Sequence, residues 1–277
     1  MPELPEVESV VRALDSLITG RQIQTAALYR DKLAPSISPQ RFEDALTGAS
    51  ISQIARRGKY ILITLGNGET LLVHLRMSGR FQLFSPDHEN PKFTHAEFFL
   101  DGGERLTFSD QRHFGYMNIV PTRDLVTSPE LRKLAPEPFS EEFSKRYFRE
   151  VLSSSRRSIK ELLLDQTKVC GLGNIYASEA LHMTRLHPQK AAREVSSIKA
   201  NRLRDNIRIV LKESIEFGST LKIDPLNLES RYYGGDYEGE WRVYDREKQP
   251  CRICGNPIRR VVQGSRSSYF CSRCQRN

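Results

Sequence analysis

The sequence predicts an α+β protein of several parts: an N-terminal helix, an antiparallel β-sandwich or barrel, a helical region and a C-terminal four-cysteine β-hairpin. Apolar residues recur at helical spacing between Val7 and Ile18. Short strand patterns separated by turn residues follow from about residue 22 to residue 120, and helical periodicity returns beyond a proline-rich linker at 134–139. A chain of 277 residues is long enough for two domains with a substantial core.

The first helix is expected to end at Gly20, and Pro2 and Glu3 lie at its start. If the initiator methionine is removed, Pro2 becomes a secondary amine whose pKa lies well below that of a lysine side chain. The positive end of the helix favours the neutral amine further, and a neutral amine is a nucleophile. Glu3 could then move protons. Taken alone, however, these residues are explained more simply as an ordinary helix start.

The strand region contains a predicted hairpin at residues 60–75, with Gly66-Asn67-Gly68 as its turn. Further strands are expected at 81–84, 96–100 and 105–108. Several short strands with regular turns are typical of an antiparallel sandwich or barrel.

Four helices are expected beyond the linker, at 139–152, 158–165, 174–183 and 197–217. On the last helix, Arg204 and Arg208 lie away from the apolar face and are expected to be solvated. The Gly-, Tyr- and Asp-rich segment from 218 to 239 is a long loop, and loops of that length are commonly functional lids or disordered.

The charge of the chain indicates a polyanionic partner. The net charge is +8, and residues 241–277 hold nine Lys and Arg against two acidic residues, so this tail carries +7. The acidic N-terminal stretch does not have the positive region of a signal peptide, and no apolar run is long enough to span a bilayer. We therefore expect no membrane association and a cytoplasmic location.

Four of the five cysteines fall in two Cys-x2-Cys pairs separated by 16 residues, namely Cys251, Cys254, Cys271 and Cys274. This spacing is typical of a tetrahedral zinc site rather than of two disulfides. Residues 258–270 form a strand–turn–strand pattern, which predicts a zinc-held hairpin with Arg266 at its tip. Four thiolates leave no open position on the metal, so one structural Zn²⁺ is expected. Cys170 stands apart and is expected to be a small buried hydrophobe.

Two basic or polar segments are candidates for phosphate binding. A glycine-relieved turn leads into a helix capped by Asn174, and the free N–H groups of such a start can bind a phosphate. A plain N-cap is the simpler explanation when the segment is taken alone. Lys59 follows Arg56 and Arg57 just before a strand, a position that also suits a solvated edge.

Two further segments are candidates for contact with a duplex. Met77 lies at a strand end, where core packing is its ordinary explanation. Arg112 and Phe114 lie two residues apart at a turn. A basic and apolar pair can wedge a duplex, and a satisfied loop arginine fits this pattern equally well.

Taken together, these segments resemble the bacterial formamidopyrimidine-DNA glycosylase family over nearly the whole chain. The resemblance is carried by the motifs Pro2–Glu8, Arg56–Tyr60, His74–Gly79, Leu164–Gln166, Gly171–Glu179 and the four-cysteine hairpin. It implies three parts: a catalytic helix and β-sandwich at 1–134, a helix–two-turn–helix domain at 135–240 with a lesion-capping loop at about 217–240, and a zinc hairpin at 241–277.

The resemblance implies a bifunctional DNA glycosylase and AP lyase of base excision repair. Such an enzyme excises oxidised purines, chiefly 8-oxoguanine and formamidopyrimidines, from duplex DNA. Pro2 would attack C1′ and form a Schiff base, and Glu3 would be the general acid/base. Lys59 is implied in β-elimination and Arg266 in δ-elimination.

The resemblance also implies a set of DNA contacts: His74, Met77, His95, Arg112, Phe114, Arg156, Lys160 and Asn174. In this set, Met77, Arg112 and Phe114 fill the gap that a flipped nucleotide leaves. The chain departs from the family pattern at Phe93, where many relatives have histidine, and at His113, where they have a second arginine. It also leaves open whether Arg156 or its neighbour Arg157 is the basic residue before Ile159.

Two other functions fit parts of the sequence. An endonuclease VIII-type glycosylase for oxidised pyrimidines shares the Pro-Glu start and the zinc hairpin, but the first residues, the gap-filling trio and the long loop favour the purine enzyme. A non-catalytic zinc-bearing DNA-binding protein would keep the basic tail and have no use for Pro2 and Glu3. The expected partner is damaged double-stranded DNA, bound by a monomer.

Overall fold

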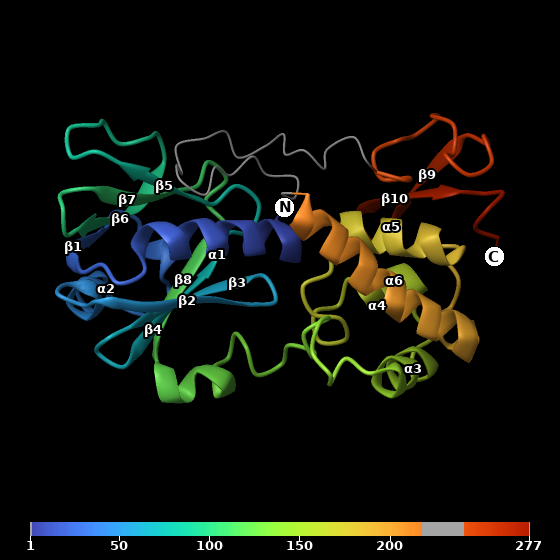
Figure 1. Ribbon diagram of the computed structural model, residues 1–277, viewed down its shortest axis with the longest axis horizontal. Coiled ribbons are helices and arrows are strands. Elements are labelled where there is room, and N and C mark those ends of the chain that lie inside the picture. The colour runs from blue at the N-terminus through green and yellow to red at the C-terminus, as the bar shows by residue number, and fades with distance from the viewer. Residues whose placement is uncertain (1, 218–240, 277) are drawn as a thin grey trace. The chain divides into compact units, whose positions relative to one another are not determined.

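The computed structural model describes residues 2–217 and 241–276. These residues form two compact units, one at 2–132 and one made of 133–217 together with 241–276. Most of the strands belong to the first unit and most of the helices to the second (Figure 1).

The first unit is a sandwich of two four-stranded antiparallel sheets, which confirms the predicted fold class and selects a sandwich over a barrel. One sheet has the order β2 (Ile51–Arg57), β3 (Tyr60–Leu65), β4 (Glu69–His74) and β8 (Tyr116–Pro121). The other has the order β1 (Ile23–Leu28), β6 (Thr94–Leu100), β7 (Arg105–Ser109) and β5 (Arg80–Phe84). Short 3-10 helices lie at Asp31–Leu33 and Thr122–Thr127.

Helix α1 (Leu4–Ile18) runs along this sandwich and shares its core (Figure 1). Val7 and Leu14 of the helix belong to one buried cluster with Ile61 of β3 and Phe98 of β6. Each such side chain contributes roughly 1.5–3 kcal/mol when it leaves water, so the cluster fixes the helix on the sheets. The chain that carries Pro2 and Glu3 is thereby anchored from its first turn onward.

Helix α2 (Pro39–Leu46) lies inside the region that was expected to be strand-like throughout, and that expectation is wrong here. Ser38 is its N-cap and accepts the backbone N–H of Arg41 at 3.1 Å. Phe42 and Leu46, four residues apart, are both buried. An apolar face of eight residues is too short to stand out from the strand patterns around it.

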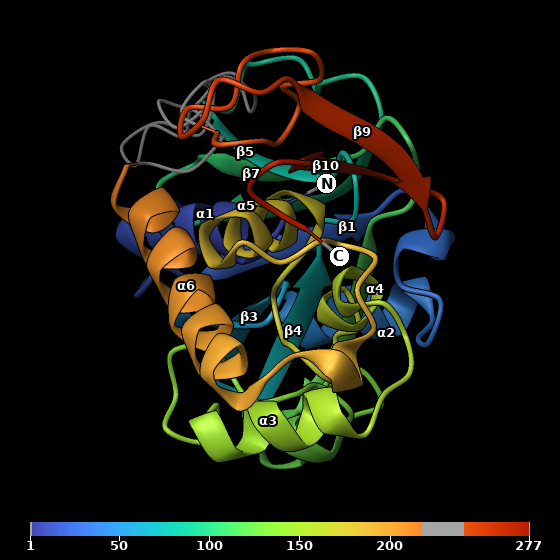
Figure 2. The same cartoon turned by 90° about the vertical axis from the view of Figure 1, so that its right-hand side faces the viewer.

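The second unit contains four α-helices and the C-terminal hairpin (Figure 2). These are α3 (Lys145–Ser153), α4 (Ile159–Leu163), α5 (Asn174–Thr184), α6 (Ser197–Glu216), β9 (Ile258–Gln263) and β10 (Arg266–Cys271), with a 3-10 turn at Ala192–Glu194. Helix α6 packs against α3 and α5, and α5 packs against β10. Tyr176 is fully buried, and its hydroxyl bonds Ser214 Oγ at 2.6 Å. Cys170 is also fully buried, as expected.

Helix α3 begins at Lys145, six residues later than predicted. Ser144 caps it, and the guanidinium groups of Arg204 and Arg208 donate to backbone carbonyls in the segment 138–143 at 2.6–2.9 Å. The expectation that these two arginines are solvated is therefore wrong. They take up carbonyls that a helix would have bonded internally, and so hold the segment out of the helix.

None of the described helices is both long enough and apolar enough to cross a bilayer. The predicted lesion-capping loop at about 217–240 lies outside the described residues except for Phe217.

Candidate active site and nucleic-acid interface

The start of α1 holds two buried carboxyl groups next to Pro2. Pro2 is itself buried, and the side chains of Glu3 and Glu6 are each 2% exposed. The backbone N–H of Glu3 donates to Glu6 Oε2 at 2.9 Å in a capping-box arrangement. Pro2 is thus held at the positive end of a 15-residue helix, with a carboxyl group on the adjacent residue.

Lys59 lies in the two-residue turn between β2 and β3, and Gly58 makes this turn possible with a φ of +59°. The side chain of Lys59 is only 6% exposed. Arg56 ties the turn to α1, because its Nε donates to Glu8 Oε2 at 3.0 Å and its Nη1 to the Gly58 carbonyl at 3.1 Å. Burial alone would raise the pKa of Glu8, but the bonds from Arg56 and Arg12 lower it.

His74 ends β4 with its ring edge against Tyr60, the centroids 4.8 Å apart. Its Nδ1 accepts the backbone N–H of Arg76 at 2.9 Å, so the proton of the neutral ring lies on Nε2. Burial lowers the pKa of His74 to about 3. The residue is therefore a neutral donor, which suits contact with a phosphate oxygen.

Arg112 and Phe114 project from a loop that Asp110 closes. Phe114 is 55% exposed, and the Arg112 guanidinium lies 5.4 Å from the centroid of its ring. Asp110 is fully buried and accepts the backbone N–H groups of Arg112 at 3.1 Å and Gly115 at 2.6 Å. An exposed aromatic and a cation are thus presented on a fixed backbone, as a duplex wedge requires.

The Met77 segment is joined to the same loop. Ser78 donates its hydroxyl to Asp110 Oδ1, and its Oγ accepts the backbone N–H of Arg112 at 3.1 Å. Gly79 allows close packing there, because a Cβ atom would lie 2.6 Å from the Leu75 carbonyl oxygen. The structure therefore brings the segments of all three predicted gap-filling residues together.

His95 lies behind this loop rather than on the surface. It is 4% exposed, and its Nε2 lies 2.9 Å from Nδ1 of the exposed His113, with the two rings stacked. Burial and the neighbouring His113 lower the pKa of His95. Of the two histidines, His113 is the one that an incoming strand would meet.

In the second unit, α5 is capped by Gly173, and the prediction that Asn174 is the N-cap is wrong by one residue. Asn174 is the first helical residue, and its Nδ2 donates to the Ser267 carbonyl at 3.0 Å. Its Oδ1 is buried and has no hydrogen-bond partner among the described residues. The side chain of Asn174 therefore bonds the hairpin strand and does not cap its own helix. The N-cap is Gly173, which makes no side-chain hydrogen bond to the helix.

Arg266 follows a two-residue turn in which Gly264 and Ser265 both have positive φ, at the predicted tip of the hairpin. The strand after it is held by Lys160, which is 1% exposed. Lys160 Nζ donates to the Ser267 carbonyl at 2.8 Å and to Ser268 Oγ at 2.7 Å. The lysine that the resemblance implied as a DNA contact thus supports the strand that begins at Arg266.

The two neighbouring arginines before α4 differ in their environment. Arg157 Nη1 bonds Asp165 Oδ2 at 2.8 Å, and its Nη2 donates to the Glu161 carbonyl at 3.0 Å. Arg156 is exposed. It is therefore the better placed of the two to meet a phosphate.

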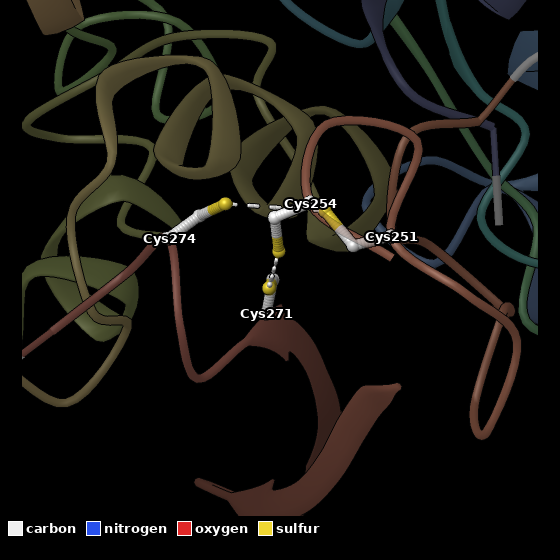
Figure 3. Close-up of side chains that lie close together, drawn as sticks. All are labelled: Cys251, Cys254, Cys271 and Cys274. Atoms are coloured by element: carbon white, nitrogen blue, oxygen red, sulfur yellow. Dashed lines mark hydrogen bonds between the residues drawn. The ribbon is translucent and has the colours of Figure 1, made fainter. Parts of the chain in front are cut away.

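The four predicted cysteines converge at the base of the hairpin, with their sulfur atoms all within 4.8 Å of one another (Figure 3). The Cys254–Cys271 and Cys251–Cys274 sulfur distances are 3.5 and 4.0 Å. A disulfide needs about 2.05 Å, whereas two sulfurs on one tetrahedral zinc lie about 3.8 Å apart for Zn–S bonds of about 2.3 Å. Burial and the surrounding sulfurs raise the pKa of Cys274, and a bound divalent cation would favour the thiolate form of such a group. The site fits one structural Zn²⁺.

Glu179 is a residue whose role the sequence did not reveal. It is fully buried in α5, and its carboxylate accepts the backbone N–H groups of residues 242–244 at 2.8–2.9 Å. Burial raises the pKa of Glu179, although the three backbone hydrogen bonds act to lower it. It lies within the Gly171–Glu179 motif, but its partners are more than 60 residues away, and no local pattern points to them.

Three family models match the chain. Residues 1–117 match the formamidopyrimidine-DNA glycosylase N-terminal domain, and residues 134–224 match the H2TH domain of the same enzymes. Residues 248–277 match the zinc finger found in FPG and IleRS.

Similar proteins cover the chain from end to end. A formamidopyrimidine-DNA glycosylase of Desulforamulus reducens is 41% identical over 277 residues, which span 100% of this chain and 99% of the relative. A mutant Lactococcus lactis FPG in complex with Fapy-dG-containing DNA is 32% identical with a TM-score of 0.93, and each chain is covered completely. Wild-type Lactococcus lactis FPG in complex with DNA that contains an oxidised pyrimidine is 33% identical with a TM-score of 0.92, again over the whole of both chains. The chain therefore belongs to the formamidopyrimidine-DNA glycosylase family.

Proposed function

We propose that this protein is a bifunctional DNA glycosylase and AP lyase of base excision repair that removes oxidised purines from duplex DNA. The observation that carries the proposal is the start of α1, where Pro2 lies at a positive helix end beside the buried Glu3. Lys59 lies on a turn that Arg56 ties to the same helix. The membership of the protein in the formamidopyrimidine-DNA glycosylase family supports this assignment.

The first chemical step needs Met1 to be removed, because an amide nitrogen is not a nucleophile. The neutral amine of Pro2 attacks C1′ of the damaged nucleotide, and the bond from C1′ to the base breaks. The base leaves with the electron pair of that bond and takes up a proton. Glu3 acts as the general acid/base that assists opening of the sugar ring, which leaves an iminium between Pro2 and C1′.

The iminium makes the C2′ protons acidic, and this drives strand cleavage. Loss of a C2′ proton expels the 3′ phosphate by β-elimination, and a second elimination expels the 5′ phosphate. Lys59 assists the first of these steps and Arg266 the second, while both contact phosphates.

The remaining site residues position the duplex. His74, Asn174 and Arg156 contact phosphates, and such contacts orient a strand without reading its sequence. Extruding the damaged nucleotide costs a few kcal/mol and leaves a gap, which Met77, Arg112 and Phe114 fill. Lys160 and His95 contribute indirectly, because Lys160 holds the Ser267 carbonyl and His95 contacts the ring of His113. The zinc bound by the four cysteines cross-links the hairpin that carries Arg266 and takes no part in the chemistry.

Borohydride trapping tests the proposal directly, because it reduces an iminium to a stable amine. A preparation without Met1, verified by intact mass, is incubated with a duplex that contains 8-oxoguanine. We expect a covalent protein–DNA adduct on Pro2 and, for Pro2→Gly, weaker strand cutting with duplex binding retained. Binding without any adduct would support the non-catalytic DNA-binding protein, and equal loss of binding and cutting in Pro2→Gly would make Pro2 structural.

Oxidised pyrimidines are the second candidate substrate class, because a related FPG forms a complex with DNA that contains one. A lesion panel under single-turnover conditions distinguishes the two classes. We expect 8-oxoguanine and formamidopyrimidines to be excised faster than oxidised pyrimidines, and the opposite order would favour the endonuclease VIII-type activity.

We further propose that the protein acts as a cytoplasmic monomer and that its parts are divided at 1–134, 135–240 and 241–277. The division of the described residues after Arg132 and the zinc-finger match at 248–277 support the boundaries. Light scattering of the purified protein with and without duplex tests the monomer, and limited proteolysis tests the boundaries.

A further inference from the structure

A histidine on α5 contacts one of the zinc-site cysteines. His182 lies near the C-terminal end of the helix and is 1% exposed. Its Nε2 lies 3.5 Å from Sγ of Cys251, which is itself 3% exposed. The contact joins residues 69 positions apart in the chain, so it is a product of the tertiary fold.

The number of available zinc ligands indicates that the contact between His182 Nε2 and Cys251 Sγ is a hydrogen bond and that His182 does not coordinate the metal. The four cysteine sulfurs lie within 4.8 Å of one another, and the histidine nitrogen does not belong to that group. Four thiolates already complete a tetrahedral zinc. A zinc-bound thiolate can only accept a hydrogen bond, so the ring must carry its proton on Nε2.

The other ring nitrogen agrees with this tautomer. Nδ1 of His182 is buried and has no hydrogen-bond partner among the described residues. A buried ring N–H without an acceptor is costly, and placing the proton on Nε2 removes that cost by aiming it at sulfur.

We propose that His182 is a positioning residue of the zinc site, whose Nε2–H donates to Cys251 Sγ and stabilises that thiolate on the metal. Zinc with four thiolates carries an excess of negative charge, and a donor from outside the ligand set lowers the charge on the sulfur. The bond thus slows zinc release and protects Cys251 from electrophiles. Partners that orient a metal ligand commonly change metal affinity by about 10- to 100-fold when they are removed.

The same helix then touches the hairpin at both ends. Asn174, in its first turn, donates to the Ser267 carbonyl, and His182 lies eight residues further along, a rise of about 12 Å. Through His182, metal retention becomes coupled to the helix whose N-terminus is proposed to meet a phosphate. Zinc loss should therefore loosen α5 as well as the hairpin.

Substitution with phenylalanine tests the proposal, because His182→Phe keeps a buried ring and removes the donor. We expect zinc release to a chelator to become about 10-fold faster or more, and alkylation of the zinc-site cysteines by N-ethylmaleimide to become faster in the zinc-loaded protein. His182→Gln, which retains an N–H donor, should recover part of the loss. The matched control is His187→Phe, because the ring of His187 packs edge-on against that of Phe270 in the hairpin, with the centroids 4.5 Å apart. Equal zinc release and alkylation in His182→Phe and the unsubstituted chain would overturn the proposal.

A second measurement needs no variant. In protein loaded with ¹¹³Cd in place of zinc, NMR should show the Nε2–H tautomer of His182 and a scalar coupling between that proton and the metal through Cys251 Sγ. A His182 ring protonated at Nδ1, without such coupling, would refute the hydrogen bond even if His182→Phe fails to fold.

Discussion

Asp110 Oδ2 accepts the backbone N–H of Gly115 at 2.6 Å, and this bond closes the loop on which Arg112 and Phe114 are exposed. The carboxylate has no access to solvent and also receives the hydroxyl of Ser78. A single buried side chain therefore sets the geometry of two segments that the proposed function places in the gap of the duplex.

Asp110→Asn should weaken this arrangement, because an amide accepts fewer hydrogen bonds than a carboxylate and brings its own donors. Burial opposes ionisation, but the bonds from Ser78 and Gly115 lower the pKa of Asp110. Its stabilisation is therefore present above the unfolded pKa of about 3.9 and is lost as the pH falls. Urea unfolding should show a loss of roughly 1–3 kcal/mol at pH 7 that shrinks below about pH 4, with exposed Asp87→Asn as control. A pH-independent difference would contradict this account.

His74 should make the first unit sensitive to mild acid. The pKa of His74 is lowered to about 3, so the unfolded chain binds a proton that the folded chain refuses. Its contribution is complete above about pH 6.5 and is lost as the pH falls, at up to about 1.4 kcal/mol per pH unit. His74→Gln should flatten the stability curve between about pH 6 and 4, and His88→Gln controls for the loss of an exposed histidine. Parallel curves for His74→Gln and the unsubstituted chain would speak against a neutral, buried ring.

Arg56→Lys should impair catalysis more than binding. Lysine keeps the charge but cannot bond Glu8 and the Gly58 carbonyl from one planar group, so the Lys59 turn loses its tie to α1. We expect single-turnover strand cutting to fall by about 10-fold with little change in duplex affinity. Arg12→Lys is the matched control, because Arg12 bonds the same Glu8 from a solvent-exposed position. Equal effects of both changes would mean that Glu8, rather than the turn, is what matters.

Zinc removal should abolish duplex binding, because the four cysteines that would hold the metal lie at the base of the hairpin that carries Arg266. Atomic absorption should give one zinc per chain, and anisotropy with a labelled abasic duplex should show binding lost on chelation and restored by added zinc. Cys254→Ser should behave like the chelated protein, while Cys170→Ala should keep its metal. Unchanged affinity of the metal-free protein would exclude a role for zinc in DNA binding.

The parts predicted well from the sequence are those whose cause is local. The spacing from Val7 to Ile18 predicts α1 because a helix repeats every 3.6 residues. The glycine turn at 66–68 predicts the β3–β4 hairpin, and four cysteines in two close pairs predict the zinc site, which the geometry fits.

The rest depended on partners far along the chain. Arg204 and Arg208 are polar residues on a helix, and only the fold shows that they hold residues 138–143 out of a helix. Lys160 was expected only as a DNA contact, and its bond to the Ser267 carbonyl, 107 positions away, could not be predicted from the sequence. The periodicity of apolar residues predicts which side of a helix or strand faces the core. It does not predict which distant carbonyl a buried cation binds.

The bonds from Lys160 and Asn174 to Ser267 have a consequence for the order of events on the ribosome. The ammonium of Lys160 is buried in the finished protein, yet its acceptor is synthesised 107 residues later. A nascent chain that has already made α4 and α5 must keep this cation hydrated, so the second unit cannot close before its last strand emerges. The strands of the sandwich all lie before residue 122, so the sandwich can fold before the second unit is complete.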